Sequence, residues 1–229
     1  MKTYATLGPA CCRAELLTDL LGLGLTGFRL NLSHTTLAAC RPWTDAVQAA
    51  RQASGRDAEL IIDMRGPELR MGPLSRPVTL TAGERVTLGP GGLPVEPDIL
   101  AAVTPGQEIL LDDGLMALRA ESCGEAVSCT VARGDLGSNL GLLRLPGAQK
   151  DMAARCRRAG KPFLVVTQLL HTMTEHPTPT RAEVLDVYNA VLDGASALML
   201  TGETARGRYP LEAVRWLLDI ARQAEEDQK

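Results

Sequence analysis

Hydrophobic and polar positions follow two patterns in the first part of the chain, one typical of strands and one typical of helices. Three short apolar runs have the length of buried strands, at residues 3–7, 27–32 and 60–63. Between them, leucines recur at helical spacing over 13–23, and Thr35 or Thr36 can cap a second helix that reaches about residue 54. The order strand, helix, strand, helix, strand predicts a parallel sheet.

A second stretch of the same kind occupies residues 176–215. Thr180 and Glu183 have the spacing of a capping box, and apolar residues recur at helical intervals until a glycine ends the helix. The apolar run 197–200 has the length of a buried parallel strand, and polar residues 201–207 follow its carboxyl end, where α/β folds place their chemistry. Each piece alone is also typical of an ordinary cap or turn. Their order favours a site.

The middle of the chain has a different pattern of apolar and polar residues. From Gly72 to about Gly106, apolar and polar residues alternate and are interrupted repeatedly by Gly and Pro, which predicts short antiparallel strands. We therefore expect an α/β fold with a small inserted β domain. The predicted divisions are 1–71 for the first part of the α/β domain, 72–125 for the insert and 126–229 for the last part.

The composition limits the classes of function. With 229 residues, 45% hydrophobic and 22% charged, the chain is expected to form one full domain, or one with a small insert. A net charge of -3 with scattered basic residues argues against nucleic acid as a partner. No stretch approaches the ~18 apolar residues of a membrane span, and no apolar signal core is present, so a cytoplasmic location is expected. The cysteines form no CxxC pair, which favours reduced packing thiols over a zinc site.

Polar side chains follow the second and third predicted strands. Arg29, Asn31 and Ser33 lie at the end of the second strand, and Asp63 ends the third. If the sheet curls into a barrel, these residues converge on one rim. The alternative is that they only cap loops.

Five blocks of sequence together resemble the pyruvate kinase family, in the family's order. They are FRLNLSH (28–34), IIDMRGPELR (61–70), DDGLMAL (112–118), PTRAEVLDVYNAVLDG (179–194) and TGETARGRYPLEAV (201–214). The resemblance implies an incomplete or shortened TIM-type (β/α) barrel with a shortened β lid inserted after strand three. It also implies transfer of a phosphoryl group from phosphoenolpyruvate to ADP, giving pyruvate and ATP.

The resemblance assigns roles to residues at matching positions. Arg29 would hold the substrate phosphate through the forked donors that suit phosphate oxygens, and Arg70 and His34 would contact the nucleotide. Thr167 would bind the carboxylate of pyruvate. With Asp135, the residues Arg29, Arg70 and Thr167 form the expected catalytic set.

Two metal ions are implied by the same resemblance. Potassium would be held by oxygen atoms, which suit a hard cation. Its expected ligands are Asn31, Ser33, Asp63 and the backbone oxygen of Met64. Met64 replaces the family's threonine, which removes one hydroxyl but keeps the carbonyl, and Glu68 matches the glutamate that accompanies potassium dependence. Magnesium, or manganese, would be bound by Asp135, with the backbone of Gly134 contacting the substrate carboxylate.

Residues 127–150 fit two interpretations. In the first, which we favour, an apolar strand ending in VARGDLG is the family's sixth barrel strand and continues without a gap into AQKDMAARCRRAGKPFLVVTQLL. In the second, LGSNLGLLRLPG closes the lid. Asp135 is the magnesium ligand in the first interpretation.

Two central barrel strands of the family have no counterpart in this chain. With them are lost a lysine and, two residues on, a glutamate, and no lysine here follows an apolar strand with that spacing. The only lysines are Lys2, Lys150, Lys161 and Lys229. The chain ends in the polar AEEDQK, so the family's C-terminal regulatory domain is not expected either. One missing electrostatic stabiliser commonly costs ~10²–10³ in rate, so we expect an impaired phosphotransferase.

Three alternatives stay open. The chain can be a non-catalytic relative that binds a metabolite or a partner, or a product that does not fold stably. It can also be a metal-dependent lyase or aldolase acting on phosphoenolpyruvate or pyruvate, which needs a second metal carboxylate, such as Glu203, near Asp135. Six predicted barrel strands leave open edges, which a smaller closed sheet, the lid or a homo-oligomer must cover.

Overall fold

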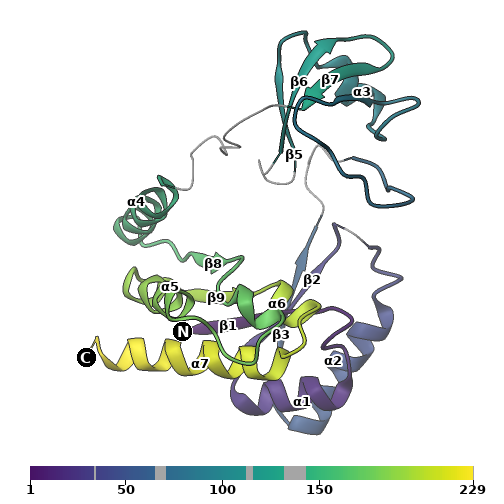
Figure 1. Ribbon diagram of the computed structural model, residues 1–229. Helices are drawn as coiled ribbons and strands as arrows, with labels where there is room; N and C mark the ends of the chain where they lie inside the picture. The colour runs from purple at the N-terminus through teal and green to yellow at the C-terminus, as the bar shows by residue number, and fades with distance from the viewer. Residues whose placement is uncertain (34, 65–70, 112–115, 132–142, 229) are drawn as a thin grey trace. The chain divides into compact units, whose positions relative to one another are not determined.

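In the computed structural model, which describes residues 1–33, 35–64, 71–111, 116–131 and 143–228, the chain divides into two compact units (Figure 1). Unit 1 comprises Met1–Gly66 and Lys150–Lys229. Unit 2 comprises Pro67–Gln149 and is therefore longer than the predicted insert of 72–125.

Unit 1 is built on a parallel sheet. Its described strands are β1 (Lys2–Thr6), β2 (Gly27–Asn31), β3 (Glu59–Asp63), β8 (Leu164–Val166) and β9 (Ala197–Leu200). Their order is β3-β2-β1-β9-β8, so the first and last strands lie side by side at the centre. A parallel sheet with helices confirms the α/β fold predicted, although five strands are described in this sheet where six were expected.

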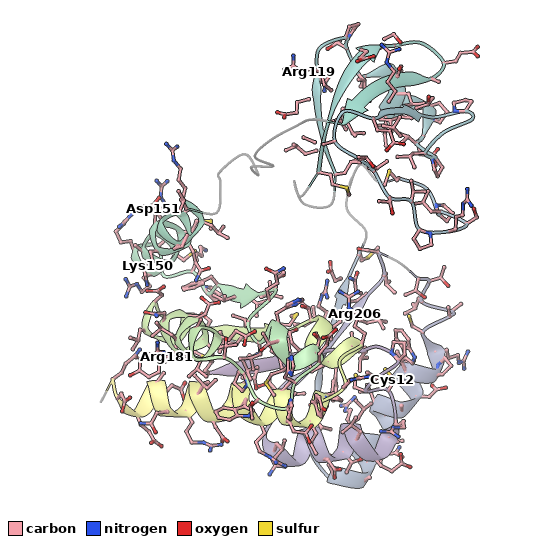
Figure 2. All side chains as sticks on the ribbon, in the orientation of Figure 1. Cys12, Arg119, Lys150, Asp151, Arg181 and Arg206 are labelled. Atoms are coloured by element: carbon pink, nitrogen blue, oxygen red, sulfur yellow. The ribbon has the colours of Figure 1, made fainter. Side chains whose placement is uncertain are left out.

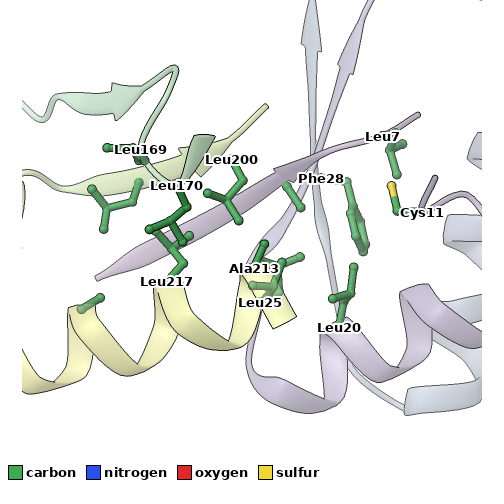
Figure 3. Close-up of a cluster of buried hydrophobic side chains, with 14 of the residues drawn as sticks. Leu7, Cys11, Leu20, Leu25, Phe28, Leu169, Leu170, Leu200, Ala213 and Leu217 are labelled. Atoms are coloured by element: carbon green, nitrogen blue, oxygen red, sulfur yellow. The ribbon is translucent and has the colours of Figure 1, made fainter. Parts of the chain in front are cut away.

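Helices α1 (Ala14–Leu23), α2 (Arg41–Ser54), α5 (Arg181–Leu192) and α7 (Pro210–Glu226) accompany this sheet, and α4 (Leu145–Arg158) leads into β8. Two short helices, η2 (His171–Thr174) and α6 (Gly202–Ala205), lie in the loops. Buried strand residues such as Phe28 of β2 and Leu200 of β9 pack with helix residues such as Leu20 and Leu217 (Figure 3). This apolar layer is the core of unit 1 and holds the strand ends in place.

Local signals located α5 well and α2 less well. The Thr180 hydroxyl accepts from the backbone N–H of Glu183 at 3.3 Å, and the Glu183 carboxylate accepts from the backbone N–H of Thr180 at 2.8 Å, so the predicted capping box is confirmed. The prediction that Thr35 or Thr36 caps α2 is wrong. The Thr36 hydroxyl accepts from Ala39 N–H within a separate turn, and the helix begins only at Arg41, followed by a proline in its first turn.

Unit 2 contains an antiparallel sheet, as the alternating pattern predicted. Its strands are β4 (Arg85–Leu88), β5 (Glu108–Leu111), β6 (Met116–Ser122) and β7 (Val127–Val131), in the order β4-β7-β6-β5. Helix α3 (Pro97–Ala101) contributes Leu100 to a separate core with Leu88 and Leu118. Unit 2 therefore has its own apolar interior.

The favoured interpretation of residues 127–131 as a barrel strand is wrong. β7 pairs antiparallel with β4 and with β6, with Cys129 opposite Val86 on one side and Ala120 on the other. Val127 and Cys129 are buried in the core of unit 2. The alternative interpretation, in which this part of the chain ends the lid, agrees with that pairing.

Candidate functional site

Three side chains meet at the carboxyl ends of β1, β2 and β3. Arg29 and Asp63 were predicted from the sequence, and Thr6 was not. Arg29 of β2 lies opposite Thr6 of β1 in the strand register. Its Nη1 donates to the Thr6 hydroxyl at 3.2 Å, and its Nε donates to Asp63 Oδ2 at 3.1 Å, with Nη2 donating to the same oxygen. The Arg29 side chain is only 16% exposed, against 43% for Asp63. The guanidinium is therefore held in one orientation by two neighbouring strands.

These contacts leave Arg29 with free binding capacity. A guanidinium carries five N–H donors, and three of them are used by Thr6 and Asp63. The remaining donors have no partner among the described residues. A fixed fork of this kind suits the oxygens of a phosphate or a carboxylate.

Thr6 was not singled out by the sequence. Its hydroxyl donates to the backbone oxygen of Leu200 in β9 at 2.9 Å while accepting from Arg29. Thr204, just beyond β9, donates its own hydroxyl to the Thr6 backbone oxygen at 2.9 Å. Thr6 thus links β9 to Arg29, and a threonine at the end of an apolar strand before Gly8 and Pro9 was the only signal available.

Oxygen atoms gather at the ends of β2 and β3. Asn31 lies opposite Asp63 in the register, and Asn31 Oδ1 accepts from the backbone N–H of Ser33 at 2.9 Å. The backbone N–H of Leu32 donates to the backbone oxygen of Asp63 at 2.9 Å, which keeps the two strand ends aligned. Asn31, Ser33 and Asp63, followed by Met64, are therefore neighbours, and amide, hydroxyl, carboxylate and carbonyl oxygens suit a hard cation such as potassium.

Glu203 has a structural position in the loop after β9. It is 1% exposed, and its carboxylate accepts from the backbone N–H of Leu170 at 3.1 Å and from that of Thr201 at 2.8 Å. Both oxygens are thus engaged by backbone donors. This arrangement ties the loop after β8 to the loop after β9, and it does not fit the metal ligand that a lyase or aldolase would need.

Thr167 directly follows β8 and is exposed. It has a φ of 78°, and the next residue, Gln168, has a φ of 57°. Such angles in non-glycine residues cost on the order of 1–3 kcal/mol each and persist where surrounding contacts impose them. Here the buried Leu169 and Leu170 follow at once, and Glu203 holds the Leu170 N–H. The carboxyl end of β8 is therefore set by its neighbours.

The structure brings Arg29, Asn31, Ser33 and Asp63 together, whereas Thr167 follows β8 at the opposite edge of the sheet. β1 and β9 lie between β2 and β8, a separation of three strand spacings, on the order of 14 Å in a flat sheet. The remaining predicted site residues lie outside the described residues. They are His34, Arg70, Gly134 and Asp135, together with Glu68.

Described lysines lie away from Arg29 and Asp63. Lys2 begins β1, at the opposite end of the strands, where its Nζ donates to Glu59 at 2.5 Å. Lys150 lies on α4 and pairs with Asp193 of the α5 C-terminus at 2.8 Å (Figure 2). Neither of these two lysines therefore supplies positive charge beside Arg29.

Other chemical sites were sought in both units. Within the described ranges, no group of three or more His, Cys, Asp or Glu residues is arranged to hold a metal ion. A cavity of about 280 Å³ lies in unit 2 and is lined mainly by apolar residues such as Leu88, Val103 and Ile109. None of the predicted site residues lines it. No helix in the described part of the chain is both long and apolar enough to cross a membrane.

Comparisons of sequence and structure with known proteins find similarity to pyruvate kinases. The family model described as pyruvate kinase, barrel domain, matches residues 1–130 and 123–214. The pyruvate kinase of Aeropyrum pernix is 28% identical over 324 aligned positions, covering 98% of this chain and 70% of the relative. That of Mycobacterium tuberculosis is 28% identical over 331 positions, covering 99% of this chain and 70% of the relative.

These alignments are longer than the chain itself. Because the chain has 229 residues, the alignment of 324 positions leaves at least 95 positions of the Aeropyrum pernix protein without a counterpart. The two matches to the family model meet at 123–130, at the start of β7.

A solved structure gives the same fold. The structure of Cryptosporidium parvum pyruvate kinase in complex with ADP superposes with a TM-score of 0.84 at 23% sequence identity, covering 98% of this chain and 68% of that chain. A likeness at this identity shows that the arrangement of elements is shared.

Proposed function

The chain belongs to the pyruvate kinase family, and we propose that it binds phosphoenolpyruvate and transfers its phosphoryl group to ADP at a reduced rate. The observation that supports this most directly is the orientation of Arg29. Its guanidinium is fixed by Thr6 and Asp63 and keeps donors for an anion at the carboxyl ends of a parallel sheet, where α/β folds bind ligands.

The Asn31, Ser33 and Asp63 oxygens, with the Met64 carbonyl, support a potassium site beside Arg29. A potassium ion there would add positive charge close to the substrate phosphate. It would also offset the carboxylate of Asp63, which otherwise neutralises Arg29. We propose that potassium strengthens anion binding for this reason.

A magnesium site finds less support. The family's second metal carboxylate has no counterpart in the sequence, and Glu203 is engaged by the backbone N–H groups of Leu170 and Thr201. We therefore assign no step to magnesium. Phosphoryl transfer depends mainly on positioning and charge neutralisation, so loss of a lysine and of a metal carboxylate predicts slow turnover.

The nucleotide is the second substrate of the proposal. The related Cryptosporidium parvum protein was solved in complex with ADP. We propose that this chain binds ADP as well, with Arg70 and His34 as the contacts that the sequence resemblance suggests. Thr167 is proposed to bind the pyruvate carboxylate, which requires the carboxyl end of a β8 strand to lie near that of β2.

The test combines binding with turnover. Calorimetry with phosphoenolpyruvate and a coupled assay for pyruvate are run with and without potassium on the wild type and on Arg29→Ala. Arg181→Ala, an exposed arginine on α5, is the matched control. We expect weak potassium-dependent turnover that is lost in Arg29→Ala and retained in the control. Absence of phosphoenolpyruvate binding in the wild type would overturn the whole proposal.

A second candidate function is binding without catalysis. The absence of a described lysine near Arg29 favours it, because the transferring phosphoryl group then lacks a lysine that would neutralise part of its charge. Saturable binding that is lost in Arg29→Ala, together with no pyruvate formation, would select this candidate over the phosphotransferase.

A further inference from the structure

The two outer strands of the unit 1 sheet have uncovered apolar surface. On β3, Leu60 and Ile62 are 39% and 47% exposed, although their register partners Phe28 and Leu30 on β2 are fully buried. The difference arises because α1 and α2 cover β2, whereas no described helix follows β3 to cover it. A parallel strand that is open on its outward face is unusual, because parallel sheets are normally covered on both faces.

At the opposite edge, β8 and α4 lack a neighbour of their own. α4 leads into β8, and a helix in that position normally covers both the strand that follows and the strand beside it. In the described residues β8 pairs with β9 alone. Only Ala153 of α4 is buried, and the adjacent Met152 is largely exposed. The exposed Met152 of α4 therefore offers apolar surface to another strand.

The charges at the two edges are complementary. Asp57 precedes β3 and Glu59 begins it; each is paired within the chain, Asp57 with Arg51 and Glu59 with Lys2, and their side chains remain 84% and 48% exposed. Arg158 ends α4 and Lys161 lies in the short connection to β8, and both are exposed. If β3 and β8 paired in parallel, these acidic and basic residues would adjoin at the same end of the sheet.

We infer that the edges are closed by a second copy of this chain, with β3 of each copy beside β8 of the other. All five strands of each sheet run in the same direction, so a two-fold axis along the strands makes both junctions parallel and leaves no open edge. α4 of one copy then covers Leu60 and Ile62 of the other. The second copy takes the place of the barrel strands that the chain lacks.

This assembly also completes the rim on which the candidate site lies. The carboxyl ends of β3 and of the second copy's β8 adjoin, so Asp63 of one copy faces Thr167 of the other. Within a single chain these residues lie at opposite edges of the sheet. The inference rests on the sheet edges and is independent of the proposed catalytic activity.

The experiment measures the mass of the full chain by sedimentation equilibrium at micromolar concentration. We expect a dimer whose dissociation constant rises at least about tenfold in Ile62→Lys. Leu185→Lys is the matched control, because Leu185 is an equally apolar residue, 58% exposed, on helix α5 rather than on an outer strand. Circular dichroism confirms that each variant is folded.

A charge exchange keeps the inference testable if Ile62→Lys does not fold. Lys161→Glu weakens the dimer, and Lys161→Glu combined with Asp57→Lys restores it, because only their juxtaposition lets one reversal compensate for the other. A monomer throughout the concentration range, a larger assembly, or a dimer unaffected by Ile62→Lys would each overturn the inference. A monomer with β3 amides protected from hydrogen exchange would identify the chain's own unit 2 as the cover instead.

Discussion

The central and outer strands of the unit 1 sheet differ in how their carboxyl ends are held. At the centre, Thr6 and Glu203 are almost completely buried and satisfy backbone groups of β9 and of the loop after β8. At the edges, Asp63 is partly exposed and Thr167 is exposed. The candidate site therefore has one half that the chain organises by itself and one half that depends on a neighbour. Four comparisons test that division, from the largest expected effect to the smallest.

The first variant removes the most deeply buried acidic side chain among the described residues. Glu203→Ala leaves the N–H groups of Leu170 and Thr201 without their carboxylate acceptor, and hydrogen bonds to a charged group contribute about 1.5–3 kcal/mol each. We expect the free energy of unfolding in urea to fall by about 4 kcal/mol. Glu226→Ala, an exposed residue at the end of α7, should stay within about 0.5 kcal/mol of the wild type. A loss for Glu203→Ala as small as that of the control would show that the central half is not organised by this residue.

The second comparison uses a pair of register partners. Leu30 of β2 is fully buried and Ile62 of β3 is 47% exposed, yet both point to the same side of the sheet. Leu30→Ala should cost about 3 kcal/mol, and Ile62→Ala less than about 1 kcal/mol at low protein concentration. Because dimer formation stabilises the folded state by mass action, the cost of Ile62→Ala should rise with protein concentration. Equal costs for the two variants at every concentration would remove the distinction between centre and edge.

The third variant breaks the link between β9 and Arg29. Thr6→Val keeps the shape of the side chain but removes the hydroxyl that donates to Leu200 and accepts from Arg29. We expect a loss of about 1–2 kcal/mol in urea unfolding and weaker phosphoenolpyruvate binding by calorimetry. Thr6→Ser retains the hydroxyl and serves as the control. If valine and serine behave alike, the hydroxyl does not position Arg29.

The smallest effect concerns the pH dependence of the α5 cap. Partial burial of Glu183 raises its pKa, but hydrogen bonds from Thr172 and Thr180 together outweigh burial and lower the pKa below the ordinary 4.5. A carboxyl group with a lowered folded-state pKa stabilises the protein above its unfolded-state pKa, and that stabilisation is lost as the pH falls through the folded-state value.

Glu183→Gln should therefore cost less than about 1 kcal/mol at neutral pH, and the difference from wild type should shrink below pH 4.5. Urea unfolding at several pH values measures both stabilities. Glu226→Gln, on the exposed end of α7, controls for removal of a carboxylate. A difference that stays constant across this range would contradict the assigned cause.

The sequence was informative where the relevant signals are local. The capping box at Thr180, the apolar run of β9 and the polar loop after it lie within one continuous stretch, and the structure has them where periodicity placed them. The start of α2 was misplaced because a threonine can serve a turn as readily as a helix cap.

The sequence was least informative where strands pair over long distances. An apolar run at 127–131 suits either sheet, and its neighbours β4 and β6 decide that it belongs to unit 2. The partners of Glu203 likewise come from a loop 33 residues earlier in the chain. No local pattern marks that contact.

By itself, the sequence determined the family, the α/β class and the polar residues at the ends of the strands, because motifs and periodicity depend on residues that are close together in the sequence. Only the tertiary structure decided the sheet to which β7 belongs, the anchoring of Arg29 by Thr6 and Asp63, and the position of β3 and β8 at the edges of the described sheet. These features depend on which strands pair across the chain. That choice is made by the burial of side chains from many segments at once.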